Sequence, residues 1–231
     1  MHQLSLPIQL RPEADFASYL AGPNREAVAA ITAWSIGSGD DFIHLFGLPD
    51  SGKTHLLQAA CQHAVQQGAS AIYLPLGHED LAPSVLDNLE LWDLVALDDV
   101  QVIAGDMDWE RGLFDLYNRL RETKRRLLVS ADAPAAELGL QLADLRSRLG
   151  WGPGYRLRPL SEEDCERLLR ESAQRRGLSL GDDAIRYIMR HCPRDVGSLL
   201  GLLEEIDRES LRTKKRPTVR LIRQVLEAPD T

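Results

Sequence analysis

The hydrophobic residues of the chain follow two alternating patterns. Short continuous apolar runs predict buried strands at 41–46, 69–75, 94–100 and 125–131, with a last extended segment at 155–160. Between these runs, apolar residues recur every three or four positions, which predicts helices at 24–34, 53–67, 79–89, 109–123 and 142–149. We expect Asn24 to cap the first of these helices and Gly68 to follow the end of the second.

Continuous apolar strands that alternate with helices indicate a parallel sheet covered by helices on both faces. This α/β pattern extends to about residue 159. From Ser161 onward only helical spacing remains, and Ser161 is a good helix N-cap because acidic residues follow it. We therefore expect an extended segment at 1–12, an α/β domain at 13–159 and a small all-helical domain at 160–231.

Composition places the chain among ordinary soluble globular proteins. Of the 231 residues, 44% are hydrophobic and 27% are charged. The apolar runs are too short to cross a membrane, and the start MHQLSLPIQL lacks the basic and apolar regions of a signal peptide. The three cysteines, Cys61, Cys165 and Cys192, are far apart and form no CxxC pair. This spacing predicts a reducing, cytoplasmic compartment without structural disulfides or a zinc site.

The net charge of −8 weighs against nucleic acid as the main direct ligand, because proteins that bind DNA on their own usually carry a basic face. The local exception is RTKKR at 212–216. We interpret it as a solvated loop between helices. A weak contribution to a DNA or protein contact stays open.

The segment GLPDSGKT at 47–54 carries the most specific chemical signal. It has the full P-loop spacing and lies between a predicted strand and a predicted helix, which is the context the motif requires. A surface turn with an ordinary lysine is the alternative interpretation, and the flanking elements disfavour it. The motif predicts ADP or ATP with Mg²⁺, held by Gly47, Leu48, Pro49, Asp50, Ser51, Gly52, Lys53, Thr54 and His55. Lys53 would reach the β- and γ-phosphates, and the Thr54 hydroxyl would bind the metal.

Acidic and polar residues end the neighbouring predicted strands. Asp98 is expected to hold Mg²⁺ through water and Asp99 to orient an attacking water. Many such ATPases have Glu at the position of Asp99, so its shorter side chain predicts slow hydrolysis. Ser130, with Asp132 after it, would contact the γ-phosphate or the attacking water; a cap or turn role for Ser130 is an equal alternative.

These motifs, followed by a helical lid, resemble an AAA+ ATPase. AGPNREAVAA, LDDVQ, FDLYNRL and especially SRLGWG at 147–152 resemble the bacterial replication initiator DnaA, over about residues 13–227. The resemblance implies a P-loop AAA+ domain with a helical lid domain. DnaA has a C-terminal helix-turn-helix domain that reads DNA, and we expect this chain, which ends at Thr231, to lack it.

The N-terminal pentamer narrows the resemblance. QLSLP, consisting of Gln3, Leu4, Ser5, Leu6 and Pro7, resembles a motif that binds the sliding clamp, the beta subunit of DNA polymerase III. An extended peptide of this kind hydrogen-bonds through Gln3 and fills an apolar pocket with its leucines. An ordinary extended N-terminus is the alternative. A DnaA-like core with this start resembles the Hda family of DnaA regulators.

The resemblance also implies roles for residues outside the P-loop. Arg148 matches an arginine finger that acts in trans on the nucleotide of a neighbouring subunit, with Arg146 in a secondary position. A helix C-cap is the alternative for Arg148. Tyr19 and Leu20, with Phe16 and Ala21, match the segment near the adenine, where core packing is an equally acceptable role.

The lid departs from the family pattern at Gly197, where a sensor arginine usually reaches the phosphates. Arg194, one turn earlier, is the candidate substitute. Without a lid arginine, discrimination between ATP and ADP weakens, so we expect a stably bound nucleotide and a weak intrinsic ATPase.

The resemblance implies a regulator of replication initiation. With the DNA-loaded clamp it would stimulate hydrolysis of DnaA-bound ATP, so that its partners are DnaA and the clamp, with DNA contacted indirectly and no membrane. An autonomous AAA+ ATPase acting as a helicase loader or motor is the alternative, and a plain DNA-binding initiator is a third. The sequence leaves the oligomeric state open, including a homo-oligomer, and places the protein in the bacterial cytoplasm near the nucleoid and replisome.

Overall fold

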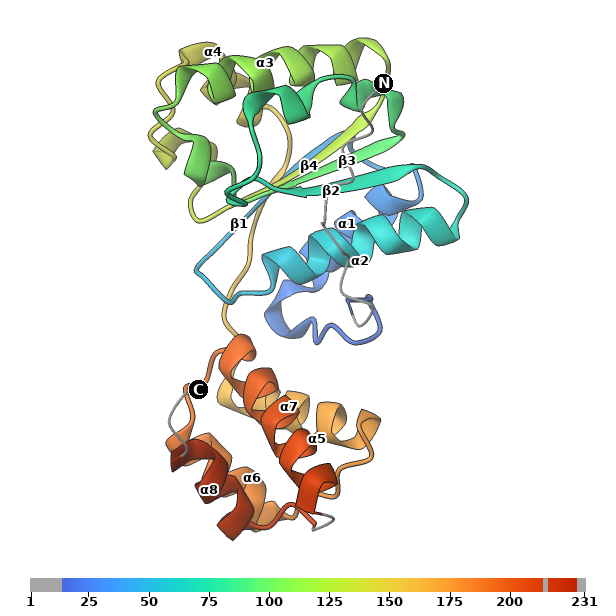
Figure 1. The fold of residues 1–231 in the computed structure, drawn as a ribbon. Helices are drawn as coiled ribbons and strands as arrows, with labels where there is room; N and C mark the ends of the chain where they lie inside the picture. The colour runs from blue at the N-terminus through green and yellow to red at the C-terminus, as the bar shows by residue number, and fades with distance from the viewer. Residues whose placement is uncertain (1–13, 214–215, 228–231) are drawn as a thin grey trace. The chain divides into compact units, whose positions relative to one another are not determined.

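The computed structural model describes residues 14–213 and 216–227. The described residues divide into two compact units, one ending at Arg158 and the other beginning at Pro159 (Figure 1). None of the described helices is long and apolar enough to cross a membrane.

The first unit is built on a five-stranded parallel sheet with the order β2-β3-β4-β1-β5. The strands are β1 (Phe42–Phe46), β2 (Ala71–Pro75), β3 (Leu94–Asp98), β4 (Arg126–Ala131) and β5 (Gly154–Arg156). Because all strands run in one direction, the residues that follow β1, β3 and β4 meet at one edge of the sheet. In parallel α/β sheets this carboxyl edge is where ligands bind.

Helices cover both faces of the sheet (Figure 1). One face packs on α1 (Arg25–Ser35) and α2 (Lys53–Gln66), and the other packs on α3 (Met107–Glu122) and α4 (Ala143–Leu149). The alternation of side chains along β3 divides its residues between the two cores: Val95 and Leu97 face α3, and Leu94 and Ala96 face α2. The fold confirms the predicted α/β class.

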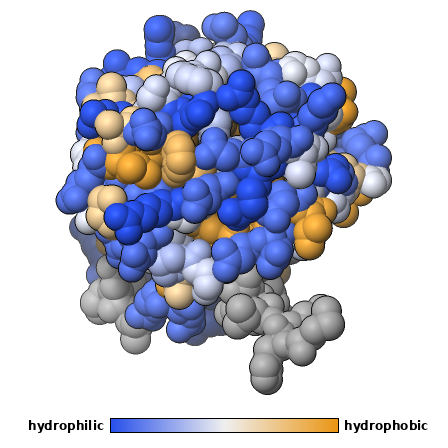
Figure 2. All heavy atoms as spheres, turned by 90° about the horizontal axis from the view of Figure 1, so that it is seen from above, coloured by the Kyte–Doolittle hydropathy of each residue, from blue (hydrophilic) through white to orange (hydrophobic). Residues whose placement is uncertain are grey.

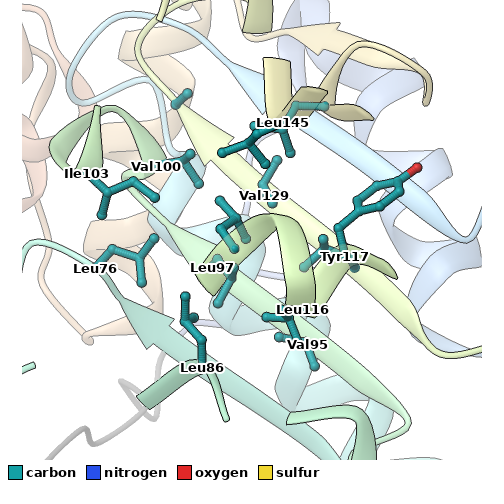
Figure 3. Close-up of a cluster of buried hydrophobic side chains, with 14 of the residues drawn as sticks. Leu76, Leu86, Val95, Leu97, Val100, Ile103, Leu116, Tyr117, Val129 and Leu145 are labelled. Atoms are coloured by element: carbon teal, nitrogen blue, oxygen red, sulfur yellow. The ribbon is translucent and has the colours of Figure 1, made fainter. Parts of the chain in front are cut away.

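The core beneath α3 is continuous and almost entirely aliphatic (Figure 3). Leu97, Leu116 and Val129 lie at its centre and are fully buried. Tyr117 lies at its margin, with the hydroxyl directed away from the aliphatic side chains (Figure 3). This core fixes the orientation of α3 and α4 on the sheet.

The segment 79–89 does not form the predicted helix. It contains the 3₁₀ turn Pro83–Leu86, and a second turn, Leu89–Leu91, follows it. Proline restricts the residue before it to extended conformations, and Asn88 adopts a left-handed φ of 61°. These two positions leave too few residues for an α-helix, although the apolar spacing resembles one.

Asn24 occupies the N-cap position of α1, after a 3₁₀ turn at Gly22–Asn24, but its side chain makes no cap hydrogen bond. Its amide instead donates to the carbonyl of Arg158 (3.0 Å) and accepts from the Arg158 N–H (2.8 Å). The predicted N-cap position is therefore confirmed, but the Asn24 side chain does not cap the helix. Asn24 fixes the last residue of the first unit to the start of α1.

The second unit contains α5 (Glu162–Arg175), α6 (Asp182–His191), α7 (Val196–Thr213) and α8 (Val219–Glu227). Their apolar faces meet in one core around Leu169, Ile188 and Leu203. The Ser161 hydroxyl accepts a hydrogen bond from the Asp164 N–H (3.1 Å), which confirms the predicted cap of α5. The two remaining short turns in the first unit are Val100–Ile103 and Ala135–Glu137.

Candidate nucleotide site and trans-acting arginine

The loop between β1 and α2 is shaped by two glycines that cannot carry a side chain. A Cβ on Gly47 would lie 2.8 Å from the Leu157 carbonyl oxygen. Gly52 has a φ of +90°, and a Cβ there would lie 2.7 Å from the ring of Tyr19. The loop therefore approaches its neighbours through its backbone, as a phosphate-binding loop requires.

The start of α2 has no side-chain cap, because its N-cap residue is Gly52. The Ser51 hydroxyl, in the loop just before it, is buried without a hydrogen-bond partner. A helix N-terminus with its positive dipole end suits an anion. The residues present therefore fit a phosphate group.

Lys53, the first residue of α2, is 8% exposed. Its ammonium donates to the carbonyls of Gly47 (2.8 Å) and Leu48 (2.9 Å). A lysine ammonium has three donors, so one remains for a phosphate oxygen. Thr54 follows in the first helical turn and is half-buried. Pro49 and Asp50 complete the loop, with Asp50 in the left-handed region at a φ of 57°.

The N-terminal segment of the first unit contacts this loop. The Tyr19 ring lies against Gly52 and 5.5 Å from the ring of His55, and its hydroxyl donates to the Ser51 carbonyl at 3.5 Å. Burial raises the pKa of Tyr19 to about 12, so the hydroxyl stays protonated at neutral pH. Phe16 packs edge-on against His63, and Leu20 is half-buried. The structure thus brings Tyr19 to the P-loop and places Phe16 further along α2.

Asp98 ends β3 and is 1% exposed. The Tyr73 hydroxyl donates to its Oδ2 at 2.8 Å, and the Ser130 hydroxyl donates to its Oδ1. Both carboxylate oxygens therefore already have a protein partner. A metal ion near this edge would contact Asp98 through water or after these hydroxyls move.

Ser130 joins the ends of β4 and β3. Besides donating to Asp98, its oxygen accepts the N–H of Asp99 at 3.0 Å, and Ser130 is fully buried. Asp99 has a left-handed φ of 61°, is half-buried, and accepts a hydrogen bond from Gln101 at 2.9 Å. Ser130 thus hydrogen-bonds both residues of the acidic pair, and its contact with the γ-phosphate or the attacking water stays a prediction. Asp132 is exposed.

Two side chains near the acidic edge were not predicted from the sequence. Tyr73 looks like one more apolar residue of β2, yet its hydroxyl contacts Asp98. Burial, together with the charge of Asp98, raises the pKa of Tyr73. The parallel register of β2 and β3 is the signal that could have identified Tyr73. It pairs Pro75 with Asp98, so Tyr73 lies two positions before the level of Asp98 on the neighbouring strand.

Glu110 is the second unpredicted residue. It is fully buried and accepts the N–H groups of Gly105 (2.8 Å), Gln141 (3.1 Å) and Leu142 (2.7 Å). Burial by itself would raise the pKa of Glu110, but the three N–H donors outweigh it and hold the pKa below its usual value. Glu110 thereby fixes the loop that leads into α4.

Arg148 lies in the last turn of α4 and is half-buried. Its guanidinium carbon lies 4.2 Å from the ring centroid of Trp151 and 6.0 Å from that of Tyr117. Its Nη1 is buried and has no hydrogen-bond partner. Arg146 is exposed and donates to the Leu140 carbonyl at 3.2 Å.

The structure does not bring Arg148 to the P-loop of its own chain. The segment after Arg148 packs where β1 begins, because a Cβ on Gly152 would lie 2.6 Å from the Phe42 carbonyl oxygen. Gly47 follows the opposite end of the same strand. Arg148 and the P-loop therefore lie toward opposite edges of the sheet.

Within the second unit, Arg194 is ion-paired with Glu162 at 2.9 Å, and both side chains are more than half exposed. Gly197 is the second residue of α7. A phosphate contact by Arg194 stays a prediction. Arg212, the first residue of RTKKR, pairs with Glu209 at 2.7 Å. The clamp-binding prediction for residues 3–7 lies outside the described residues.

A parallel sheet with a P-loop after its β1 strand, an acidic pair after its β3 strand and a following helical unit defines the AAA+ class of P-loop proteins. The family model for the bacterial DnaA ATPase domain matches residues 10–154, and the model for the Hda lid domain matches residues 162–226. The chain belongs to the DnaA-related AAA+ family and is of the Hda type.

Solved structures show the same fold. Domain III of the Thermotoga maritima replication initiation protein DnaA has a TM-score of 0.83 at 20% identity, over 95% of this chain and 98% of that chain. AMPPCP-bound DnaA from Aquifex aeolicus has a TM-score of 0.73 at 22% identity, over 89% and 68%. The Thermotoga maritima RuvB Holliday junction branch migration motor has a TM-score of 0.71 at 17% identity, over 94% and 72%. At these identities the likeness concerns the fold alone.

Proposed function

We propose that this protein regulates replication initiation by stimulating hydrolysis of ATP bound to DnaA, together with the DNA-loaded sliding clamp. The observation that carries the proposal is the position of Arg148, whose guanidinium is unpaired and lies away from the P-loop of its own chain. Such a group suits the transferring phosphate of a nucleotide held by another subunit. Membership of the DnaA-related family, with an Hda-type lid, makes DnaA the partner of choice.

The protein itself would hold ADP or ATP at the P-loop. The uncapped start of α2 and the third donor of Lys53 suit the phosphates. Relatives of the same fold were solved with AMPPCP, which supports an adenine nucleotide here. The segment at Tyr19 and Leu20 would contact the nucleotide next to the loop.

Magnesium fits this site without a dedicated carboxylate cage. The described part of the chain has no cluster of three or more His, Cys, Asp or Glu residues able to hold a metal. Mg²⁺ bound with a nucleotide typically needs only one or two protein ligands besides phosphates and water. Thr54 and Asp98 would supply these, and the ion would neutralise phosphate charge.

The acidic edge favours a weak intrinsic ATPase. Both oxygens of Asp98 are held by hydroxyls, and Asp99 accepts a hydrogen bond from Gln101. A metal ion and an attacking water can be positioned for hydrolysis in cis only if these hydrogen bonds break, and the cost of breaking them slows hydrolysis. The bound nucleotide would thus order the protein for its partner and need not turn over.

The N-terminal pentamer Gln3–Pro7 would bind the clamp, which brings the protein to DNA indirectly and places it with the replisome in the bacterial cytoplasm. The alternative function, an autonomous AAA+ helicase loader or motor, is favoured by the complete P-loop and acidic pair. Rapid ATP hydrolysis by the isolated protein would support that alternative.

The test follows ADP formation on ATP-bound DnaA in the presence of clamp-loaded DNA. We expect the wild-type protein to accelerate hydrolysis. Gln3→Ala should lose the acceleration by failing to bind the clamp, and Arg148→Ala should lose it while still binding the clamp. If the folded wild-type protein leaves the rate of DnaA-bound ATP hydrolysis unchanged, the regulator function is wrong.

A further inference from the structure

Arg148 has no acidic or carbonyl partner, in contrast to several other arginines of the first unit. Arg119 pairs with Glu90, and Arg125 pairs with Asp93. The Nη1 of Arg148 is instead buried without any hydrogen-bond partner in the described structure. A buried guanidinium nitrogen left in this way is costly, and such groups are usually satisfied. Because hydrogen bonds do not hold the Arg148 guanidinium, another kind of contact must keep the side chain in place.

Two aromatic rings provide that support. The guanidinium carbon lies 4.2 Å from the ring centroid of Trp151 and 6.0 Å from that of Tyr117, both within the range of cation–π attraction. An aromatic face attracts a cation without neutralising it or occupying its N–H groups. A carboxylate partner would do both, so the rings hold Arg148 with its charge available.

The backbone couples Trp151 to Arg148. The Trp151 N–H donates to the Arg148 carbonyl at 3.1 Å, in the turn that closes α4. The next residue, Gly152, is packed so closely on Phe42 that a Cβ would not fit. Tyr117 is anchored in the core beneath α3, where it is 8% exposed (Figure 3). Both rings are therefore set by elements of the fold.

A second arginine lies beside Arg148. The guanidinium of Arg121 also lies over the Trp151 ring, at 5.4 Å from its centroid. The face above α3 and α4 is mainly hydrophilic, with hydrophobic residues in separate patches (Figure 2). Trp151 is 59% exposed. Two guanidiniums over one ring suit an anionic group better than an apolar partner.

We propose that Trp151 is a positioning residue for Arg148. Together with Tyr117, its ring holds the guanidinium without an anionic partner, so that its charge is kept for the triphosphate of a nucleotide bound to another protein. This inference rests on the proposed function, because it names the device that orients the trans-acting arginine. A cation–π contact of ordinary strength predicts that removal of the indole lowers the maximal stimulated rate by about tenfold.

The first part of the test is independent of DnaA. In arginine-labelled protein, the side-chain Nε–H resonance of Arg148 is identified by its absence from Arg148→Lys. We expect it to be shifted upfield by the Trp151 ring, to lose the shift in Trp151→Ala, and to keep part of it in Trp151→Phe. An Arg148 resonance with an ordinary shift in the wild-type protein overturns the inference, whatever the outcome for the proposed function.

The second part measures hydrolysis of DnaA-bound ATP with clamp-loaded DNA at increasing concentrations of each variant. We expect Trp151→Ala to lower the maximal rate without changing the half-saturating concentration, and Trp151→Phe to recover most of the rate. Trp92→Ala removes another surface tryptophan and should match the wild type. A higher half-saturating concentration for Trp151→Ala, at an unchanged maximal rate, would make Trp151 a docking residue and overturn the inference. If the wild type also fails to stimulate, the proposed function is wrong, and the NMR shift alone decides whether Trp151 holds Arg148.

Discussion

Asp98 and Glu110 are buried carboxylates with different kinds of support. Asp98 receives hydroxyl groups from Tyr73 and Ser130, which are side chains of the neighbouring strands. Glu110 receives three backbone N–H groups from two loops. Hydroxyl groups can rotate away when a ligand arrives, whereas loop N–H groups are fixed by the chain. The support of Asp98 is therefore compatible with the metal site proposed above, whereas Glu110 stabilises the fold.

Glu110→Gln tests the second role. The amide keeps one acceptor oxygen but sets its NH₂ group against an N–H donor, so we expect the free energy of unfolding at pH 7 to fall by about 2 kcal/mol. Because the pKa of Glu110 is lowered on folding, its stabilising effect is present above the unfolded pKa and is lost as the pH falls through the folded pKa. Urea unfolding at pH 7, 5, 4 and 3 should show the difference between variant and wild type shrinking in acid.

Glu122→Gln is the matched control, since Glu122 is exposed at the end of the same helix. Its unfolding free energy should follow the wild type at every pH. A difference between Glu110→Gln and the wild type that stays constant from pH 7 to pH 3 would show that the charge of Glu110 does not contribute.

Residues whose roles depend on tertiary contacts escape sequence analysis. Asn24 lies at a helix start, where local sequence predicts a cap. Its side-chain amide instead donates to the carbonyl of Arg158, 134 positions away. Ser130, which the sequence predicts to end a strand, lies one residue before the end of β4, and its hydroxyl donates to Asp98. Tyr73 and Glu110 carry no local motif at all. The hydrogen-bond partners of these polar groups are distant in sequence and come together only in the folded chain.

At the scale of elements, the sequence is more informative. The five strands and the helices that flank them follow from apolar periodicity, because each must bury a face of defined width. The exception at 79–89 arises from Pro83 and Asn88, whose backbone preferences override the spacing. A motif such as the P-loop can be placed reliably from the sequence, because the strand before it and the helix after it are themselves predicted correctly.

Substitution of the two glycines at opposite ends of α2 can distinguish an effect on the nucleotide site from an effect of backbone strain. Gly52 and Gly68 both have left-handed φ values, of 90° and 87°. A Cβ on Gly52 would strike the Tyr19 ring, whereas nothing lies within 4 Å of one on Gly68. We expect each substitution by alanine to cost about 1 kcal/mol of stability through backbone strain, with a further cost at Gly52 for displacing the Tyr19 ring. Only Gly52→Ala should weaken ADP binding, by at least about tenfold.

Titration with a fluorescent ADP analogue, beside urea unfolding of the same samples, checks this prediction. Equal losses of ADP affinity in Gly52→Ala and Gly68→Ala would mean that general destabilisation, and not the loop before α2, controls binding.

At the scale of the whole molecule, charge limits the choice of partner. Because the protein has a net charge of −8, most of its surface should be repelled by the phosphates of duplex DNA. We expect the isolated protein to bind a labelled duplex with a Kd weaker than about 10 µM at 0.15 M salt, as measured by fluorescence anisotropy. Binding in the nanomolar range under these conditions would favour a direct DNA-binding function over recruitment through the clamp.

The central claim is that this protein acts on a nucleotide held by DnaA and not on its own. The most direct measurement is a single-turnover assay with clamp-loaded DNA in which radiolabelled ATP is bound to only one of the two proteins. We expect rapid conversion to ADP when the label is on DnaA, slow conversion when it is on this protein, and loss of the rapid reaction in Arg148→Ala. Rapid conversion only of the label on this protein, unaffected by Arg148→Ala, would show that the protein is an autonomous ATPase and not a regulator of DnaA.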